Sequence, residues 1–249
     1  MKETAVLAAT EAGKILFENF GKVRETRSKG DRDLVTNVDL LAEKKVLEVI
    51  KSAFPDHRII SEEAGDSKID SDYTWHVDPL DGTHNYLYGI PYYGVSIGLY
   101  KKGNPHLGAI FLPHFNELYY AEKGKGAFLN GKPIHVSDRP ASESIFNMDS
   151  QFPREPEWYI SSLGRLVPKF FGFRVMGSAV TSLAFVAKGT IGAWLTFIAK
   201  TWDVAAGSLL VTEAGGKVTN LDGKPWAPGR FPLLATNGKI HGEVLSLLR

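Results

Sequence analysis

The sequence predicts a protein of the mixed α/β class, built from alternating layers of helix and sheet. Three observations carry this prediction. Two helical segments open the chain, short β segments separated by Gly, Asn and Pro turns follow, and helices and strands alternate beyond about residue 140. We expect an N-terminal half, about 1–140, with an antiparallel sheet, and a C-terminal half, about 141–249, of the α/β type. Because no long linker separates them, they should pack as one unit, 1–249.

The composition is that of an ordinary folded protein. The 249 residues are 43% hydrophobic and include no Cys, which excludes a disulfide framework, a thiolate nucleophile and a Cys-ligated metal. Because 29 basic and 28 acidic residues leave a net charge of +1, no bulk field recruits nucleic acid or an anionic membrane. The longest apolar stretch, 177–199, is interrupted by Lys188, and the N-terminus lacks a signal-peptide core. We therefore expect a soluble, cytoplasmic protein with a small-molecule partner.

The first twenty residues predict a surface helix that ends at Gly21. Its expected inner stripe is formed by residues at helical spacing, namely Val6, Thr10, Gly13, Phe17 and Phe20. The polar segment 22–33 mixes charges without periodicity, which predicts a mobile loop.

A second helix is predicted from Thr36 or Asn37 to about Ala53, with Pro55 ending it. Its expected buried side chains are Leu41, Ala42, Val46, Val49 and Ile50.

Short strands are then predicted at 58–61 and 73–78, followed by hairpin segments at 93–100, 107–112, 117–121 and 127–136. The second half predicts four helices, near 158–167, 178–188, 203–214 and 241–248. Gly189 and Gly215 stand where helix C-terminal caps are expected.

The densest chemical motif is Asp78-Pro79-Leu80-Asp81-Gly82-Thr83. A strand delivers Asp78, and the following turn opens a helix, so two carboxylates and the Leu80 carbonyl form a set of hard oxygen ligands suited to Mg²⁺. The first N–H groups of that helix suit a phosphate. A solvated Asx-Pro turn explains most pairs of acids around a proline, but the whole hexapeptide should arise by chance only about once in ~10⁵ sequences of this length.

Further short blocks of sequence accompany this hexapeptide along the chain. The strongest is Trp202-Asp203-Val204-Ala205-Ala206-Gly207, leading into 213–216, and weaker blocks lie at 33–36 with Asp39, 61–63, 117–119 and 124–127 with 130–131. With the hexapeptide, they resemble the inositol monophosphatase family of metal-dependent phosphatases, whose superfamily includes lithium-sensitive and fructose-1,6-bisphosphatase-like members. The resemblance implies a layered αβαβα sugar-phosphatase fold and a homodimer.

Roles carried over by the resemblance fall on three groups of residues. Two or three Mg²⁺ ions are expected on Glu62, Asp78, the Leu80 carbonyl, Asp81 and Asp203. The attacking water is expected to be oriented by Thr83 and Asp39, with Glu63 close by. The substrate is expected to meet Gly82, Thr83, Gly177, Ser178, Ala179 and Thr196. Taken alone, Asp203 would be a helix N-cap and Glu62-Glu63 a solvated loop.

One position departs from the inositol-selective members. They carry a Glu that contacts inositol hydroxyls where this chain has Thr196, whose short neutral side chain cannot replace a carboxylate. Lys200 either faces a second phosphate or is a solvated loop charge. The expected activity is Mg²⁺-dependent hydrolysis of inositol 1-phosphate, fructose 1,6-bisphosphate or both. The alternatives are a 3′(2′),5′-bisphosphate nucleotidase, a histidinol-phosphate phosphatase, and a non-catalytic binding protein on a phosphatase fold.

Overall fold

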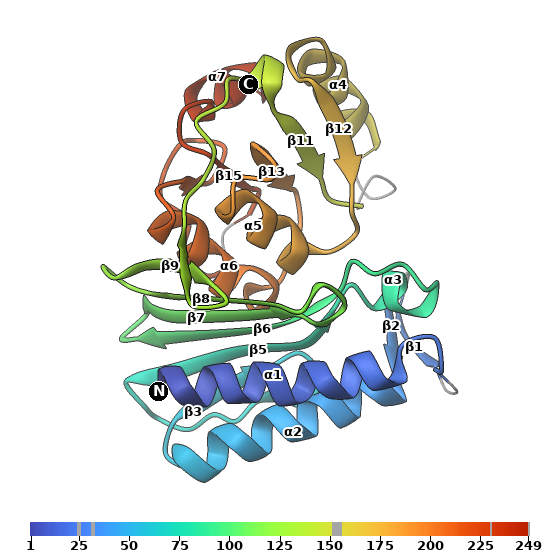
Figure 1. The fold of residues 1–249 in the computed structure, drawn as a ribbon, viewed down its shortest axis with the longest axis vertical. Coiled ribbons are helices and arrows are strands. Elements are labelled where there is room, and N and C mark those ends of the chain that lie inside the picture. Colours follow the sequence, from blue (N-terminus) through green and yellow to red (C-terminus); the bar gives the residue numbers. More distant parts are fainter. Residues whose placement is uncertain (24–25, 31–32, 151–155, 230, 249) are drawn as a thin grey trace.

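The computed structural model describes residues 1–23, 26–30, 33–150, 156–229 and 231–248. Helices and sheets alternate in five layers (Figure 1). Helices α1 and α2 cover one face of an eight-stranded sheet, α5 and α6 lie between that sheet and a five-stranded sheet, and α4 and α7 cover the far side. The predicted layered α/β class is therefore confirmed.

The eight-stranded sheet has the order β10-β9-β8-β7-β6-β5-β3-β4. Its pairs are antiparallel except β3 with β5, which run parallel. Its strands are β3 (Arg58–Ser61), β4 (Gly65–Asp66), β5 (Tyr73–Asp81), β6 (Gly94–Lys101), β7 (Asn104–Leu112), β8 (Glu117–Glu122), β9 (Gly126–Leu129) and β10 (Lys132–Ile134). All the strands predicted between residues 58 and 136 are present, with ends shifted by a few residues.

The five-stranded sheet has the order β12-β11-β13-β15-β14 and mixes parallel and antiparallel pairs. Its strands are β11 (Ile145–Met148), β12 (Gly172–Val175), β13 (Ala193–Thr196), β14 (Lys217–Thr219) and β15 (Leu233–Thr236).

The helices are α1 (Lys2–Asn19), α2 (Asn37–Ala53), α3 (Thr83–Leu87), α4 (Pro156–Leu166), α5 (Ala179–Ala187), α6 (Thr201–Glu213) and α7 (His241–Leu248), and short 3₁₀ turns lie at Pro113–Phe115, Ala141–Glu143 and Val167–Lys169. The predicted helices are confirmed within a few residues. Helix α2 begins where expected because the Thr36 hydroxyl accepts from the Val38 and Asp39 N–H groups, and the Asp39 carboxylate accepts from the Thr36 N–H.

The predicted inner stripe of the first helix is confirmed at Gly13 but is otherwise rotated away from the face that the structure buries. Helix α1 buries a face of small residues, Ala5, Ala8, Ala9, Ala12 and Gly13, together with Leu16, whereas Phe17 is 55% exposed. Small side chains let α1 lie close to α2 and to the sheet beneath, and a Cβ on Gly13 would come within 2.2 Å of the Phe111 ring. The buried face of α1 is therefore the one with small side chains, which allow the helix to approach its neighbours closely, and not the one with the largest hydrophobic side chains.

Two smaller predictions also need correction. Leu41, expected inside α2, is 50% exposed, and the buried face carries the acids Asp39 and Glu43 instead. The expected mobile loop at 22–33 contains strand β1 (Thr26–Gly30), which pairs antiparallel with β2 (Asp33–Thr36). That pairing is set by a neighbouring segment, so the lack of local periodicity did not reveal it. Residues 24–25 and 31–32 lie outside the described residues.

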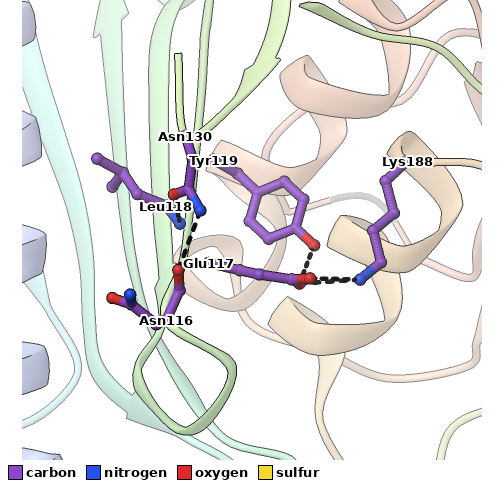
Figure 2. Close-up of polar contacts among 6 residues, drawn as sticks. All are labelled: Asn116, Glu117, Leu118, Tyr119, Asn130 and Lys188. Atoms are coloured by element: carbon purple, nitrogen blue, oxygen red, sulfur yellow. Dashed lines mark hydrogen bonds and ion pairs between the residues drawn. The ribbon is translucent and has the colours of Figure 1, made fainter. Parts of the chain in front are cut away.

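A polar cluster ties the eight-stranded sheet to α5 (Figure 2). Lys188, at the C-terminal end of α5, pairs with both Glu117 carboxylate oxygens at 2.8 and 2.9 Å, and the Tyr119 hydroxyl donates to the same carboxylate. The Asn130 amide, in the turn between β9 and β10, donates to the carbonyl of Asn116, the residue before β8, at 3.1 Å. Strand β8 is thereby fixed to the middle helical layer.

Among the described residues, no helix is both long and apolar enough to cross a membrane.

Candidate active site

Strand β5 ends in a distortion that presents the acidic motif. Its pairing with β6 shifts register between Asp78 and Asp81, where Pro79 offers no N–H to the ladder. The Leu80 N–H turns back to donate to Asp78 Oδ1 at 3.0 Å. Gly82 then opens α3 with φ of +85°, and a Cβ there would stand 2.7 Å from the Tyr92 carbonyl oxygen, so only glycine fits.

Helix α6 brings Asp203 to the same place from the other half of the chain. Gly98 and Gly108 allow the helix to lie directly on β6 and β7, since a Cβ on Gly108 would come within 2.7 Å of the Ala206 carbonyl oxygen. The Ser96 hydroxyl donates to the Trp202 carbonyl at 3.1 Å and fixes the first turn of α6. Asp203 is the third residue of α6, and its Oδ2 accepts from the N–H of the N-cap residue Lys200 at 2.7 Å, so the interpretation of Asp203 as the N-cap itself is wrong by three positions.

The acids of the motif repel one another. Asp78 is 2% exposed, and burial, followed by the charges of Glu62, Asp81 and Asp203, raises its pKa well above the ordinary value. Burial and the charge of Asp81 raise the pKa of Asp203 in the same way. Burial also raises the pKa of Asp81 to about 6, although hydrogen bonds from α5 work against it. Carboxylates with raised pKa values bind a proton or a cation near neutral pH.

Glu62 lies beside Asp78 because a buried acid of α2 holds its loop. The Glu43 carboxylate is 6% exposed and accepts from the Ser61 hydroxyl at 2.5 Å and from the Glu63 and Ala64 N–H groups at 3.1 and 2.9 Å. The Glu62 N–H donates to the Val77 carbonyl at 3.1 Å, next to Asp78, and the charge of Glu62 contributes to the raised pKa of Asp78. The sequence reasoning missed Glu43, although it stands one helical turn after Asp39 on the buried face of α2.

Thr83 and Asp39 are in contact, as the sequence led us to expect. The Thr83 hydroxyl lies 3.3 Å from Asp39 Oδ1 and 3.1 Å from the Leu80 carbonyl oxygen. Asp39 also accepts from the Thr36 N–H at 2.9 Å, and burial raises its pKa to about 6. Because the Thr83 hydroxyl donates its hydrogen bond to Asp39 or to the Leu80 carbonyl, its oxygen can still accept a hydrogen bond from a water molecule.

The start of α5 faces Asp81. Its carboxylate accepts from the Ser178 hydroxyl and from the Ala179 and Val180 N–H groups at 3.3 and 3.1 Å. The loop before α5 is held by the Asn85 amide, which donates to the Met176 and Tyr92 carbonyls at 2.7 and 2.8 Å. The N-terminus of α5 therefore already binds an anionic group, the carboxylate of Asp81.

Several of these residues line one recess of about 100 Å³. Its walls are Asp81, Asp149, Ser150, Gly177, Ser178, Ala179, Trp194, Thr196, Ile198, Ala199 and Asp203. The recess thus joins the end of β5, the start of α5, β13 and the start of α6. It unites Asp81 and Asp203 with the predicted substrate residues Gly177, Ser178, Ala179 and Thr196.

Asp149 is a second residue that the sequence reasoning missed. It follows β11, and one of its oxygens accepts from the Thr196 hydroxyl at 2.5 Å and the Phe197 N–H at 2.8 Å. Thr196 is 1% exposed, so its hydroxyl is used to hold Asp149. The recess therefore has a carboxylate from β11 beside Thr196. An acid directly after a short strand was the only available signal.

The donor set fits Mg²⁺ chemically, since carboxylates and a backbone carbonyl are the oxygen ligands that this ion prefers. In the part of the chain that is described, no three His, Cys, Asp or Glu side chains form a ready-made metal cluster. Asp81 is bound to the start of α5 and Asp203 to the Lys200 N–H. The repulsion that raises their pKa values is nevertheless what a divalent cation would relieve.

Comparisons with known proteins agree on the kind of fold. The sequence model of the inositol monophosphatase family matches residues 1–249. A fructose-1,6-bisphosphatase/inositol-1-monophosphatase of Aquifex aeolicus is 37% identical over 99% of this chain and 94% of its own length. The Nus factor SuhB of Haemophilus influenzae is 36% identical over 100% of this chain and 96% of its own.

Solved structures give the same result. The extragenic suppressor protein suhB of Bartonella henselae superposes with a TM-score of 0.96 at 33% identity, covering 99% of this chain and 97% of that one. An IMPase/NADP phosphatase complexed with Mg²⁺ and phosphate superposes with a TM-score of 0.84 at 27% identity, covering 96% of this chain and 90% of the other.

Proposed function

The chain belongs to the inositol monophosphatase family, and we propose that it is a Mg²⁺-dependent phosphomonoesterase that acts on small polyol or sugar phosphates. The observation that carries the proposal is that Asp78 and Asp81, at the end of β5, and Asp203, in the first turn of α6, have pKa values raised by burial and by the charges of neighbouring carboxylates, which for Asp81 is the charge of Glu62. A site of this kind is costly without cations and well suited to them.

In this proposal the Mg²⁺ ligands are Glu62, Asp78, the Leu80 carbonyl, Asp81 and Asp203. Bound Mg²⁺ would supply positive charge that offsets the charge of a phosphate ester and its leaving oxygen. Residues 1–140 contribute most of these ligands, and residues 141–249 complete the substrate side.

The chain's own hydroxyl and carboxylate would handle the attacking water. Thr83, oriented by Asp39 at 3.3 Å, accepts a hydrogen bond from the water and so aims its lone pair at phosphorus. Glu63, on the turn held by Glu43, lies on the same loop as Glu62 and is the nearby carboxylate of the proposal. Water then displaces the alcohol in line, without a phosphoenzyme.

The substrate would enter the 100 Å³ recess, whose wall includes Gly177, Ser178 and Ala179. Gly82 and Thr83 do not line the recess but follow its lining residue Asp81 in the chain, and in this proposal they bind the phosphate. Thr196 supports this wall through Asp149. Inositol 1-phosphate and fructose 1,6-bisphosphate are the proposed substrates. A 3′(2′),5′-bisphosphate nucleotide and histidinol phosphate are the alternatives.

Hydrolysis of a generic phosphate ester, with Mg²⁺ and after chelation, tests the reaction type. We expect turnover with Mg²⁺, none with chelator, and a loss of at least about 10³-fold in kcat for Asp81→Asn. Asp72→Asn is the matched control, because Asp72 is exposed and pairs only with Lys102 among the interactions observed in the described chain. Wild-type turnover in chelator, or full activity of Asp81→Asn, would refute the proposal. Comparing kcat/KM over the four candidate substrates then identifies the preferred ester.

A second candidate function rests on the relatives named Nus factor SuhB, which match this chain over its whole length. On this alternative the fold serves as a binding protein for a macromolecular partner. A folded protein that binds Mg²⁺ in calorimetry but turns over none of the four esters would favour it over the phosphatase.

A further inference from the structure

Among the proposed Mg²⁺ ligands, Glu62 alone lies in a loop, whereas the others stand on β5 or α6. Residues 62–64 join β3 to β4, and Ser61 pairs with Gly65 across them. Strand β4 has two residues and forms the edge of the eight-stranded sheet, so its pairing gives the loop little support. The position of Glu62 therefore depends on contacts from outside this hairpin.

The side chain of Glu43, on α2, supplies such contacts. One of its oxygens, Oε1, accepts from the Ser61 hydroxyl at 2.5 Å and from the Glu63 and Ala64 N–H groups at 3.1 and 2.9 Å. The Glu62 N–H, which lies between these donors in the chain, donates to a carbonyl of β5 at 3.1 Å. The loop is thus held on both sides of Glu62, by a buried carboxylate and by the neighbouring strand.

Glu62 acts on every acid of the cluster. Burial is the largest cause of the raised pKa values there, and the charge of Glu62 contributes at each of four acids, namely Asp39, Asp78, Asp81 and Asp203. These acids belong to α2, β5 and α6, so Glu62 lies near the place where the three elements meet. A cation shared by carboxylates of β5 and α6 would require Glu62 to stay at that place.

We propose that Glu43 is a positioning residue that sets the affinity of this site for Mg²⁺ by holding Glu62 in place. The inference rests on the proposed function, in which Glu62 is a ligand of the ion. A ligand that is already held in its binding position loses little conformational freedom on binding, so the loss of its support weakens binding. The support requires an acceptor at Oε1 and not a charge, because all three bonds to the loop end on that one oxygen.

Calorimetric titration of the full chain with Mg²⁺ tests this role. In Glu43→Ala the three donors lose their acceptor, and we expect the dissociation constant of Mg²⁺ to rise by about 10- to 100-fold. Glu43→Gln keeps a carbonyl oxygen in the position of Oε1, so its dissociation constant should stay within about threefold of the parent. Ser61→Ala removes only one donor, should raise the constant by about fivefold, and tests the same contact if Glu43→Ala does not fold.

Ile50→Ala is the matched control for a general loss of stability. Ile50 is fully buried on the same helix, about two turns beyond Glu43. This variant should unfold at a lower urea concentration in chelator and keep the parental dissociation constant for Mg²⁺.

Three results would overturn the role of Glu43 in a parent that binds Mg²⁺ and hydrolyses esters. They are parental affinity in Glu43→Ala (or in Ser61→Ala, if Glu43→Ala does not fold), an equal loss of affinity in Ile50→Ala, and a loss in Glu43→Gln as large as that in Glu43→Ala. A parent that binds no Mg²⁺ would refute the proposed function itself, and this inference with it.

Discussion

The two ends of helix α5 hold two polar clusters of opposite design. At its C-terminal end Lys188 pairs with Glu117, and Tyr119 donates to the same carboxylate (Figure 2). At its N-terminal end Ser178 and two N–H groups bind Asp81, which in turn faces Asp78 and Asp203. Both arrangements suit the helix dipole, which favours an anion at the start and a cation at the end.

The two clusters differ in whether the charges of their carboxylates are balanced by cationic side chains. The Glu117 cluster contains both signs of charge within hydrogen-bonding distance, so it needs nothing from outside and serves to join β8 to the middle layer. In the acid cluster, burial and the like charges of neighbouring carboxylates raise the pKa values, and the charge of Lys200 offsets this only in part at Asp203. A buried cluster that is complete in itself therefore indicates structure, whereas one that lacks its counter-charge indicates a binding site.

Asp78→Asn should give the largest effect on kcat, and it best distinguishes the acid cluster from the cluster of Glu117 and Lys188. Removing one ligand from a cation site is expected to lower kcat by at least about 10³-fold, equivalent to about 4 kcal/mol in the barrier. The metal-free variant should unfold no earlier than the parent, because one repelling charge is gone. Steady-state kinetics and urea unfolding in chelator measure the two quantities. A variant that is active but unstable would show that Asp78 has a structural role like that of Glu117.

The second prediction concerns Mg²⁺ as the missing counter-charge. At about 100 times its dissociation constant, Mg²⁺ should raise the free energy of unfolding of the parent by about 2.7 kcal/mol. The increment should vanish in Asp203→Asn and persist in Lys188→Met, since only the first removes a proposed ligand. Urea unfolding with and without Mg²⁺ measures it. The same increment in all three proteins would mean that the cation binds elsewhere.

The sequence was informative wherever the signal is local. The start of α2 follows from the Thr36 cap, and the turn after Asp78 follows from Pro79 and Gly82. It was misleading where a second segment decides, as in the small-residue face of α1 and in the β1–β2 pair. The site follows the same division. The motif acids could be named in advance. Glu43 and Asp149 act through partners 18 to 48 residues away, so the helical spacing of Glu43 from Asp39 and the place of Asp149 after a strand did not reveal what they bind.

Lys188→Met tests whether the paired cluster is structural. It leaves Glu117 without its cation in a site where both side chains are about one-fifth exposed (19% and 21%), so we expect a loss of about 2 kcal/mol in unfolding free energy. Glu117→Gln combined with Lys188→Met should recover part of this loss, because no unpaired charge remains. The kcat with Mg²⁺ should stay within about threefold of the parent. Urea unfolding of the double-mutant cycle gives the coupling energy, and a coupling near zero would remove the structural role assigned to the pair.

The smallest expected effect is a pH dependence that only the acid end should show. Burial raises the pKa of Asp81 to about 6 in the folded protein, against an ordinary value of 3.8. Between these values the folded state binds more protons than the unfolded state, so the contribution of Asp81 to stability rises as the pH falls from 7 towards 4. Buried His76 and His241, with pKa values lowered to about 4, act in the opposite direction. The informative quantity is therefore the parent minus Asp81→Asn, measured in chelator, which should favour the parent by about 1 kcal/mol more at pH 5 than at pH 7. The difference in unfolding free energy between the parent and Lys188→Met should not change between pH 5 and pH 7. If the difference for Asp81→Asn also does not change with pH, the Asp81 carboxylate is already compensated by its hydrogen bonds from α5.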